Sequence, residues 1–114
     1  MTRLFIRKMI PRAAILEFAN EVVRLFSPEQ VILFGSQACG NATADSDVDI
    51  LILLDHSGRN IDKAIEILRA TNYHFPLDLI VRKPHEFHAR ANAGDYFLKE
   101  IDETGEVLFT QHRR

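Results

Sequence analysis

Two short apolar runs separated by one polar segment set the strongest limit on how this chain folds. The runs are Val31–Phe34 and Ile50–Leu54, and the polar segment between them is Gly35–Asp49. Both runs are rich in β-branched and aromatic residues and are bounded by turn formers, which is typical of buried strands. The polar segment is too short for a regular crossover helix, so the two strands are predicted to be antiparallel neighbours.

Apolar spacing predicts helices before and after these strands. A helix over about 11–26 begins at Pro11, since proline is tolerated in a first turn, and ends at Ser27-Pro28. Its apolar stripe consists of Ile15, Phe18, Ala19, Val22 and Phe26. A second helix is predicted over about 61–71, with Ile61, Ala64, Ile65 and Leu68 on its inner face.

The remainder of the chain continues this alternation. A third strand is predicted at 77–81, followed by a helix that begins at Pro84. Gly94-Asp95 breaks that helix, and Asp95 is expected to cap the next one, which ends at Gly105. A short edge strand at 107–109 then precedes a basic tail, His112 to Arg114.

This order of elements predicts the α+β class: a small mixed β-sheet backed by helices, and not a Rossmann fold. Residues 1–114 are expected to form one domain, because that length can bury a core without disulfides. Apolar residues are 46% and charged residues 26% of the chain, which is ordinary for a globular protein.

Charge and cysteine content limit the partners and the cellular location that we expect for this chain. A net charge of -2 gives no reason to expect nucleic acid or an anionic membrane as a partner. No apolar run approaches the roughly 20 residues that span a bilayer. Cys39 is the single cysteine and cannot form an internal disulfide, which favours a cytoplasmic location. The basic residues of the first sixteen positions are interpreted as a solvated arm or helix face, with a transit peptide as the alternative.

The main functional candidates are carboxylates at the start of the second and third strands. Side chains two apart in a strand point to the same face, so Asp47 and Asp49 are expected to lie together while Val48 points away. Asp78 is the one charged residue within the third apolar run. If the second and third strands are neighbours, Asp78 joins the pair. Three carboxylates make a hard oxygen site that suits Mg²⁺ or Mn²⁺.

Gly35 and Ser36 supply the second half of this hypothesis. A glycine lets the backbone approach a ligand closely, and N–H groups at the start of a short helix from Ser36 attract anions. A metal site beside a phosphate site predicts phosphoryl or nucleotidyl transfer.

Other ligand motifs fit less well. The acids from Asp45 to Asp49 imitate the start of an EF-hand, but Ile50 and His56 occupy the positions that require glycine and glutamate. No Gly-Lys-Ser/Thr triplet is present for a Walker A loop. His85 and His88 have zinc-like spacing without a third ligand nearby. Tyr73 to Phe75 form a polar-aromatic patch that could contact a base or a partner, although ordinary packing is the default interpretation.

At this point the residues resemble a known family. Gly35-Ser36, ten further residues and Asp47-Val48-Asp49 are similar to the GS-x10-D-x-D signature of the DNA polymerase β-like nucleotidyltransferases. The chain resembles the minimal single-domain branch, the MNT proteins, over nearly its whole length. The resemblance implies the polymerase β palm-like fold and metal-dependent transfer of a nucleoside monophosphate, AMP from ATP, to a hydroxyl group.

The resemblance also implies roles and a partner. Asp47, Asp49 and Asp78 would be metal ligands and catalytic residues, with Asp78 activating the acceptor hydroxyl, and Gly35 and Ser36 would bind the triphosphate. Many MNT proteins are antitoxins of a small helical HEPN protein, so a toxin–antitoxin pair is expected. A contact-only binding module, or a stand-alone transferase that modifies a small molecule, remains an alternative, and a homo-oligomer stays open.

One position departs from the family pattern. The usual sequence after Gly-Ser ends in Ala-Arg-Gly, whereas this chain has Cys39 in place of the arginine. Cysteine cannot make the bidentate phosphate contact of a guanidinium. The change is expected to weaken or abolish activity unless Arg82, Lys83 or Arg90 substitutes.

Overall fold

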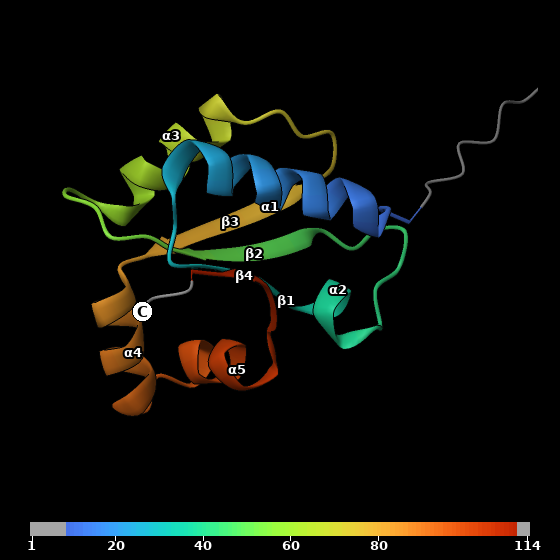
Figure 1. The fold of residues 1–114 in the computed structure, drawn as a ribbon. Helices are drawn as coiled ribbons and strands as arrows, with labels where there is room; N and C mark the ends of the chain where they lie inside the picture. The colour runs from blue at the N-terminus through green and yellow to red at the C-terminus, as the bar shows by residue number, and fades with distance from the viewer. Residues whose placement is uncertain (1–8, 112–114) are drawn as a thin grey trace, which may run out of the picture.

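A mixed β-sheet forms the centre of the protein in the computed structural model, which describes residues 9–111. Within that range the sheet has four strands in the order β3-β2-β1-β4 (Figure 1). The strands are β1 (Gln30–Phe34), β2 (Val48–Leu53), β3 (Leu77–Arg82) and β4 (Glu106–Thr110). The predicted α+β class is confirmed.

Strand pairing explains why the sheet is mixed. β1 and β2 are antiparallel, as expected, with Phe34 opposite Asp49. Only the single turn α2 (Ser36–Cys39) and a loop connect them. β2 and β3 are parallel, with Asp49 opposite Asp78, and α3 (Asn60–Ala70) makes the crossover between them. β4 pairs with β1 in the antiparallel direction and forms the far edge.

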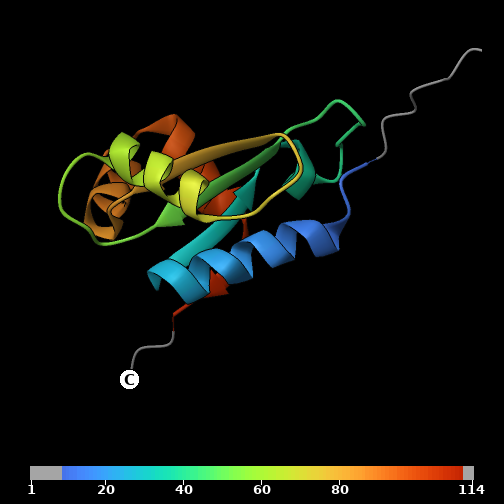
Figure 2. The ribbon, with the colours of Figure 1, turned by 90° about the horizontal axis from the view of Figure 1, so that it is seen from above.

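Helices cover both faces of the sheet. α1 (Arg12–Phe26) and α3 lie on one face, whereas α4 (Pro84–Asn92) and α5 (Tyr96–Thr104) lie on the other (Figure 1). Figure 2 shows α1 and α3 side by side on their face, with α3 toward the β3 edge. We call these two sides the α1 face and the α5 face.

Burial on both sides explains the unbroken apolar run Ile50–Leu53 of β2. Ile50 and Ile52 pack with the buried stripe of α1, whereas Leu51 and Leu53 pack with Phe87 of α4 and its neighbours. A strand that is covered on both faces has no solvent side, so polar residues do not alternate with apolar ones. The stripe predicted for α1 is confirmed at its four buried positions, Ile15, Phe18, Ala19 and Val22.

The inner face predicted for the second helix is partly wrong. Ala64 and Ile67 are the buried residues of α3, whereas 59% of the surface of Ile61 and 40% of that of Ile65 are exposed. The helix carries Ile61 and Ile65 on one side and Ile67 well around from them, so the spacing of apolar residues alone does not define its phase. Contact with β3 selects the side of Ala64 and Ile67.

Helix ends follow local chemistry. Asp95 caps α5 as predicted, because its Oδ1 atom accepts a hydrogen bond of 3.1 Å from the Leu98 amide. Gly105 ends α5 in a confined space: an added Cβ would lie 2.5 Å from the Ile101 carbonyl oxygen and 2.6 Å from Ile32 Cγ2. A side chain at Gly105 would therefore prevent β4 from reaching its place beside β1.

Several basic residues of the two ends were interpreted from sequence alone. Arg3, Arg7 and Lys8 and the tail from His112 to Arg114 lie outside the described residues. Arg12 is within them, and its guanidinium forms an ion pair with Glu106 of β4. No helix in the described part of the chain is long and apolar enough to cross a membrane.

Candidate active site

The three predicted carboxylates meet on the α5 face, where β2 and β3 begin. Asp49 and Asp78 occupy paired positions of the parallel ladder, and Asp47 lies two residues before Asp49. Asp49 is half-buried, whereas Asp47 and Asp78 are exposed. The pairing of β2 with β3 therefore brings Asp78 to the Asp47–Asp49 pair, as the sequence analysis expected.

Among the three aspartates, Asp49 has a carboxyl pKa that is raised by its surroundings. Partial burial raises the pKa of its carboxyl group, and the negative charges of Asp78 and then Asp47 raise it further. Both neighbouring charges thus act on Asp49 directly. A cation placed among the three groups would relieve this repulsion and favour the ionised form of Asp49.

The chemistry of the donor set fits a hard divalent cation. Carboxylate oxygens are the ligands that Mg²⁺ and Mn²⁺ prefer. Among residues 9–111, no group of three or more His, Cys, Asp or Glu side chains is placed so that it could hold a metal ion. Mg²⁺ usually takes only one or two carboxylates and completes its shell with water and substrate oxygens.

Gly35 lies directly against the Asp49 carboxylate. Its backbone has φ 74° and ψ -155°, a conformation that favours glycine. A Cβ atom built on Gly35 would collide with Oδ2 of Asp49. Two requirements therefore select glycine at this position: the backbone conformation, and the space that Asp49 occupies.

The single turn that follows Gly35 opens toward the same region. The amides of Ala38 and Cys39 both donate hydrogen bonds of 3.1 Å to the Gly35 carbonyl oxygen. Intrahelical bonding starts with these two donors, so the amides of Ser36 and Gln37 lie at the open start of the turn. The prediction that Gly35 and Ser36 bind an anion depends on these two amides.

Hydrogen bonds order the loop that leads to Asp47, and sequence reasoning missed the residues that make them. The Thr43 amide donates to Ser46 Oγ at 2.8 Å, and the Ser46 amide donates to the Thr43 carbonyl oxygen at 3.0 Å. Gln37 Nε2 donates to the Ser46 carbonyl oxygen at 3.3 Å. The spacing of Thr43 and Ser46 is a signal for such a turn. These contacts set the path of the chain immediately before Asp47.

Two of the basic residues considered as substitutes for the missing arginine are remote from the carboxylates. Arg82 pairs with Leu53 at the end of β3 that is opposite to Asp78, about 13 Å along the strand. The ammonium group of Lys83 donates to the Gly58 carbonyl oxygen at 2.8 Å. Arg90 lies in the last turn of α4. Cys39 itself is exposed at the end of α2.

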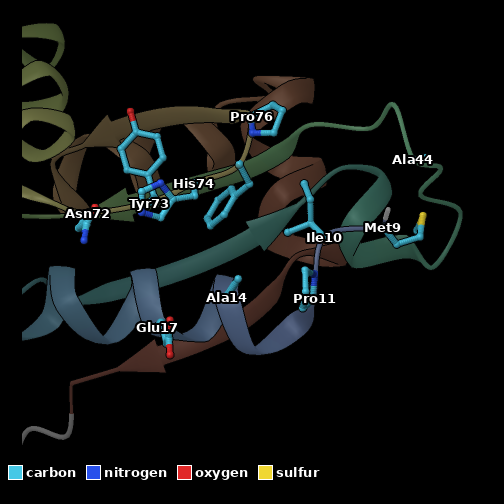
Figure 3. Close-up of a pocket in the computed structure, with 11 residues that line it drawn as sticks. Met9, Ile10, Pro11, Ala14, Glu17, Ala44, Asn72, Tyr73, His74 and Pro76 are labelled. Carbon is cyan, nitrogen blue, oxygen red and sulfur yellow. The ribbon is translucent and has the colours of Figure 1, made fainter. Parts of the chain in front are cut away.

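A cavity of about 510 Å³ lies on the other side of the sheet, between the start of α1 and the segment before β3 (Figure 3). Tyr73 and Phe75 line it, and their rings pack edge-on against Phe18 at centroid distances of 5.7 and 6.2 Å. These contacts confirm the packing role that was the default interpretation of the aromatic patch. The cavity opens on the α1 face, and its lining reaches Ala44 and Pro76, which precede Asp47 and Asp78 by three and two residues.

Comparison with known proteins places this arrangement in a family. The sequence model of the nucleotidyltransferase domain matches residues 15–106. The chain belongs to the nucleotidyltransferase domain family. Gly35, Ser36 and the three aspartates all lie within the matched range of this nucleotidyltransferase domain, and the family resemblance stated from the sequence is confirmed. A comparison with curated proteins found no match.

Solved structures support the fold of the nucleotidyltransferase domain. A protein from Sulfolobus solfataricus that is assigned to the nucleotidyltransferases has a TM-score of 0.61 and 20% identity, covering 87% of this chain and 79% of its own. A toxin–antitoxin crystallised with AMP-PNP has a TM-score of 0.53 and 20% identity, covering 85% and 74%. At these identities the likeness concerns the fold, which is that of nucleotidyltransferases.

Proposed function

We propose that this nucleotidyltransferase domain transfers a nucleoside monophosphate from a nucleoside triphosphate, ATP, to a hydroxyl acceptor. The observation that carries the proposal is the convergence of Asp47, Asp49 and Asp78 beside Gly35 on the α5 face. The acceptor oxygen forms a bond to the α-phosphorus while the bond from that phosphorus to the bridging oxygen breaks. Pyrophosphate leaves, and the nucleoside monophosphate stays on the acceptor.

Each residue has a distinct part in this proposal. Asp47, Asp49 and Asp78 would hold Mg²⁺ or Mn²⁺, which would neutralise charge on the phosphates and make the acceptor hydroxyl more acidic. Asp78 is exposed and therefore accessible to an acceptor, so we assign it to orient the acceptor hydroxyl and take up its proton. Gly35 and Ser36 receive the triphosphate through the open start of α2.

The biological setting that we propose is a toxin–antitoxin pair. Support comes from the toxin–antitoxin with AMP-PNP among the structures of the same fold. In this setting the acceptor would be presented by another protein, a small helical HEPN-like toxin. Such a pair would act in the cytoplasm, in agreement with a chain whose single cysteine is Cys39.

A transfer assay with two differently labelled nucleotides tests the reaction. The protein is incubated with Mg²⁺ and a co-expressed neighbouring protein, with ATP labelled at either the α- or the γ-phosphate. We expect the α-label on the acceptor and no γ-label, and loss of transfer in Asp47→Asn. Asp102→Asn, which changes an exposed acid of α5, is the matched control and should retain activity. Transfer of the γ-label, or full activity in Asp47→Asn, would overturn the proposal.

A contact-only binding module is a second candidate, and one observation favours it. Cys39 replaces the expected arginine, and neither Arg82 nor Lys83 is beside the carboxylates to replace its charge. In that case Asp47→Asn would still neutralise the toxin completely in cells, although it transfers no label. If the toxin remains active in cells that carry Asp47→Asn, the result favours the proposed enzymatic function over the contact-only module.

Restoring the arginine gives a direct prediction about Cys39. Cys39→Arg is expected to tighten ATP binding by about fivefold, because an exposed charge-assisted contact contributes on the order of 1 kcal/mol. Titration calorimetry with ATP and Mg²⁺ measures the change, and Cys39→Gln controls for side-chain size without charge. The gain should diminish as salt is raised. Equal affinities of the arginine and glutamine variants would show that position 39 does not contact the phosphates.

A further inference from the structure

Phe97, in the first turn of α5, is an exposed aromatic residue on the same face of the sheet as the carboxylates. Half of its surface, 50%, is open to solvent. Its ring meets that of Phe34 edge-on, with centroids 5.8 Å apart and planes at 84°. In a perpendicular contact Phe34 covers at most one face of the Phe97 ring. The ring is therefore positioned by the protein and still accessible to a ligand.

Phe34 connects this ring to the candidate active site. It directly precedes Gly35 and lies opposite Asp49 in the ladder of β1 and β2. Opposed residues of an antiparallel pair project to the same face, with Cβ atoms about 5 Å apart. Phe97, Phe34 and Asp49 thus form a continuous strip that runs from α5 to the carboxylates. We call the side chains of Phe97 and Phe34 the aromatic strip.

The start of α5 is held firmly enough to present Phe97 in one place. Asp95 caps the helix through the Leu98 amide. Leu98 and Ile101 are 2% and 3% exposed, and both pack in the apolar cluster that contains Phe34. The exposure of Phe97 is therefore a consequence of its position on an anchored helix, and a ligand would find the ring already in place.

We propose that Phe97 is the stacking surface for the base of the nucleoside triphosphate. The inference rests on the proposed function, which puts the α-phosphate at the carboxylates. Ribose tethers the base to that phosphate, so the base must lie on the α5 face, at the distance of one nucleoside from Asp49. The aromatic strip offers a flat apolar surface on that face. Tyr73 and Phe75 line a cavity on the α1 face, opposite the face that Phe34 occupies beside Asp49.

Stacking has a recognisable consequence for specificity. Every base has a π face, so an aromatic platform binds purines and pyrimidines without reading their hydrogen-bonding edges. Phe97 is thus expected to contribute affinity for nucleotides as a class. The contribution should be absent for a ligand that has phosphates and no base.

Two ligands and three variants separate this role from a structural one. ATP and tripolyphosphate are titrated, each with Mg²⁺, into the full chain and into Phe97→Ala, Phe97→Trp and Tyr96→Ala. Tyr96 is the matched control, because it is the adjacent aromatic residue and is 86% exposed. The protein has no tryptophan of its own, so the indole of Phe97→Trp is a single fluorescent reporter.

The expected results are specific to ATP. Phe97→Ala should weaken ATP binding at least about fivefold and leave tripolyphosphate binding unchanged, whereas Phe97→Trp should bind ATP as well as the original chain. ATP should quench the indole and tripolyphosphate should not. Tyr96→Ala should bind both ligands normally.

Other results would overturn the assignment in distinguishable ways. Unchanged ATP binding in Phe97→Ala, or an equal loss of affinity for both ligands, would show that the base does not stack on Phe97. The proposed function would not be affected by that result. Normal ATP binding with lost transfer to the partner protein would place the acceptor on the strip instead. If the original chain binds neither ATP nor tripolyphosphate, both this inference and the proposed function fail.

Discussion

Gly35→Ala is expected to lower the free energy of unfolding by about 2–4 kcal/mol, the largest stability loss that we predict. Two costs add at this position. A side chain at φ 74° is strained, and its Cβ atom would collide with Oδ2 of Asp49. The variant should also lose nucleotidyl transfer, because relief of the collision displaces the carboxylate. Thermal unfolding measures the loss as a shift of about 4 °C per kcal/mol.

Gly40 provides a control without a collision. Its φ is 77° and no atom lies within 4 Å of an added Cβ, but its ψ of 9° belongs to the left-handed helical region, which side chains tolerate better than the ψ of -155° at Gly35. Gly40→Ala should therefore cost only about 1 kcal/mol. In an Asp49→Ala background, Gly35→Ala should cost less than in the original chain, since the colliding group is gone. Equal costs of Gly35→Ala in the two backgrounds would show that the Asp49 carboxylate moves aside freely, contrary to our account.

Asp49→Asn is expected to abolish transfer and, in the absence of metal, to stabilise the fold. Asparagine keeps the shape of the side chain and removes a charge that partial burial, Asp78 and Asp47 all disfavour. Because solvent screens the site, the gain near pH 7 should be no more than about 1 kcal/mol. Chemical denaturation in a chelator measures it, with Asp102→Asn as the control that should show no gain.

The pH dependence of this gain has a defined sign. The pKa of Asp49 is raised in the folded protein, so the folded state binds the Asp49 proton more tightly than the unfolded chain does. Stability from this group is therefore present at low pH and is lost as pH rises from the ordinary aspartate value through the folded pKa. The difference between Asp49→Asn and the original chain should be full above that window and vanish below it. A gain that persists in acid would have another origin.

Added metal should make the original chain more stable than Asp49→Asn, the reverse of the order expected without metal. Mg²⁺ or Mn²⁺ that binds the folded state alone raises the unfolding midpoint of the original chain by mass action. Asp49→Asn has lost one of the three carboxylates and should respond less. An equal response of both proteins to the metal would place the ion elsewhere.

Local periodicity was sufficient for the parts of the fold that depend on one segment. Alternation along a strand puts Asp47 and Asp49 on one face wherever the strand is placed. The apolar run before Gly35, the stripe of α1 and the cap at Asp95 likewise follow from spacing and turn chemistry within a few residues. Because such patterns arise from covalent geometry, the strands, helices and Gly-Ser turn could be predicted without knowledge of their neighbours.

Contacts between distant segments could not be predicted from such local patterns. The phase of α3 was mispredicted because both Ile61 and Ile65 are apolar, and only packing against β3 decides which side is buried. The distance of Arg82 from the carboxylates follows from the direction of β3 in the sheet. The collision that excludes a side chain at Gly35, and the contact of Phe97 with Phe34, depend on elements that approach only after folding.

By itself, the sequence determined which residues could carry the chemistry: Gly35 and Ser36 at a turn, Asp47 and Asp49 on one side of a strand, and Asp78 as an acid in an apolar run. Tertiary structure alone decided that Asp78 lies opposite Asp49, that Gly35 is pressed against that carboxylate, and that an aromatic strip lies beside them. The physical reason is that side-chain direction is a property of the local backbone, whereas proximity depends on which apolar faces bury one another.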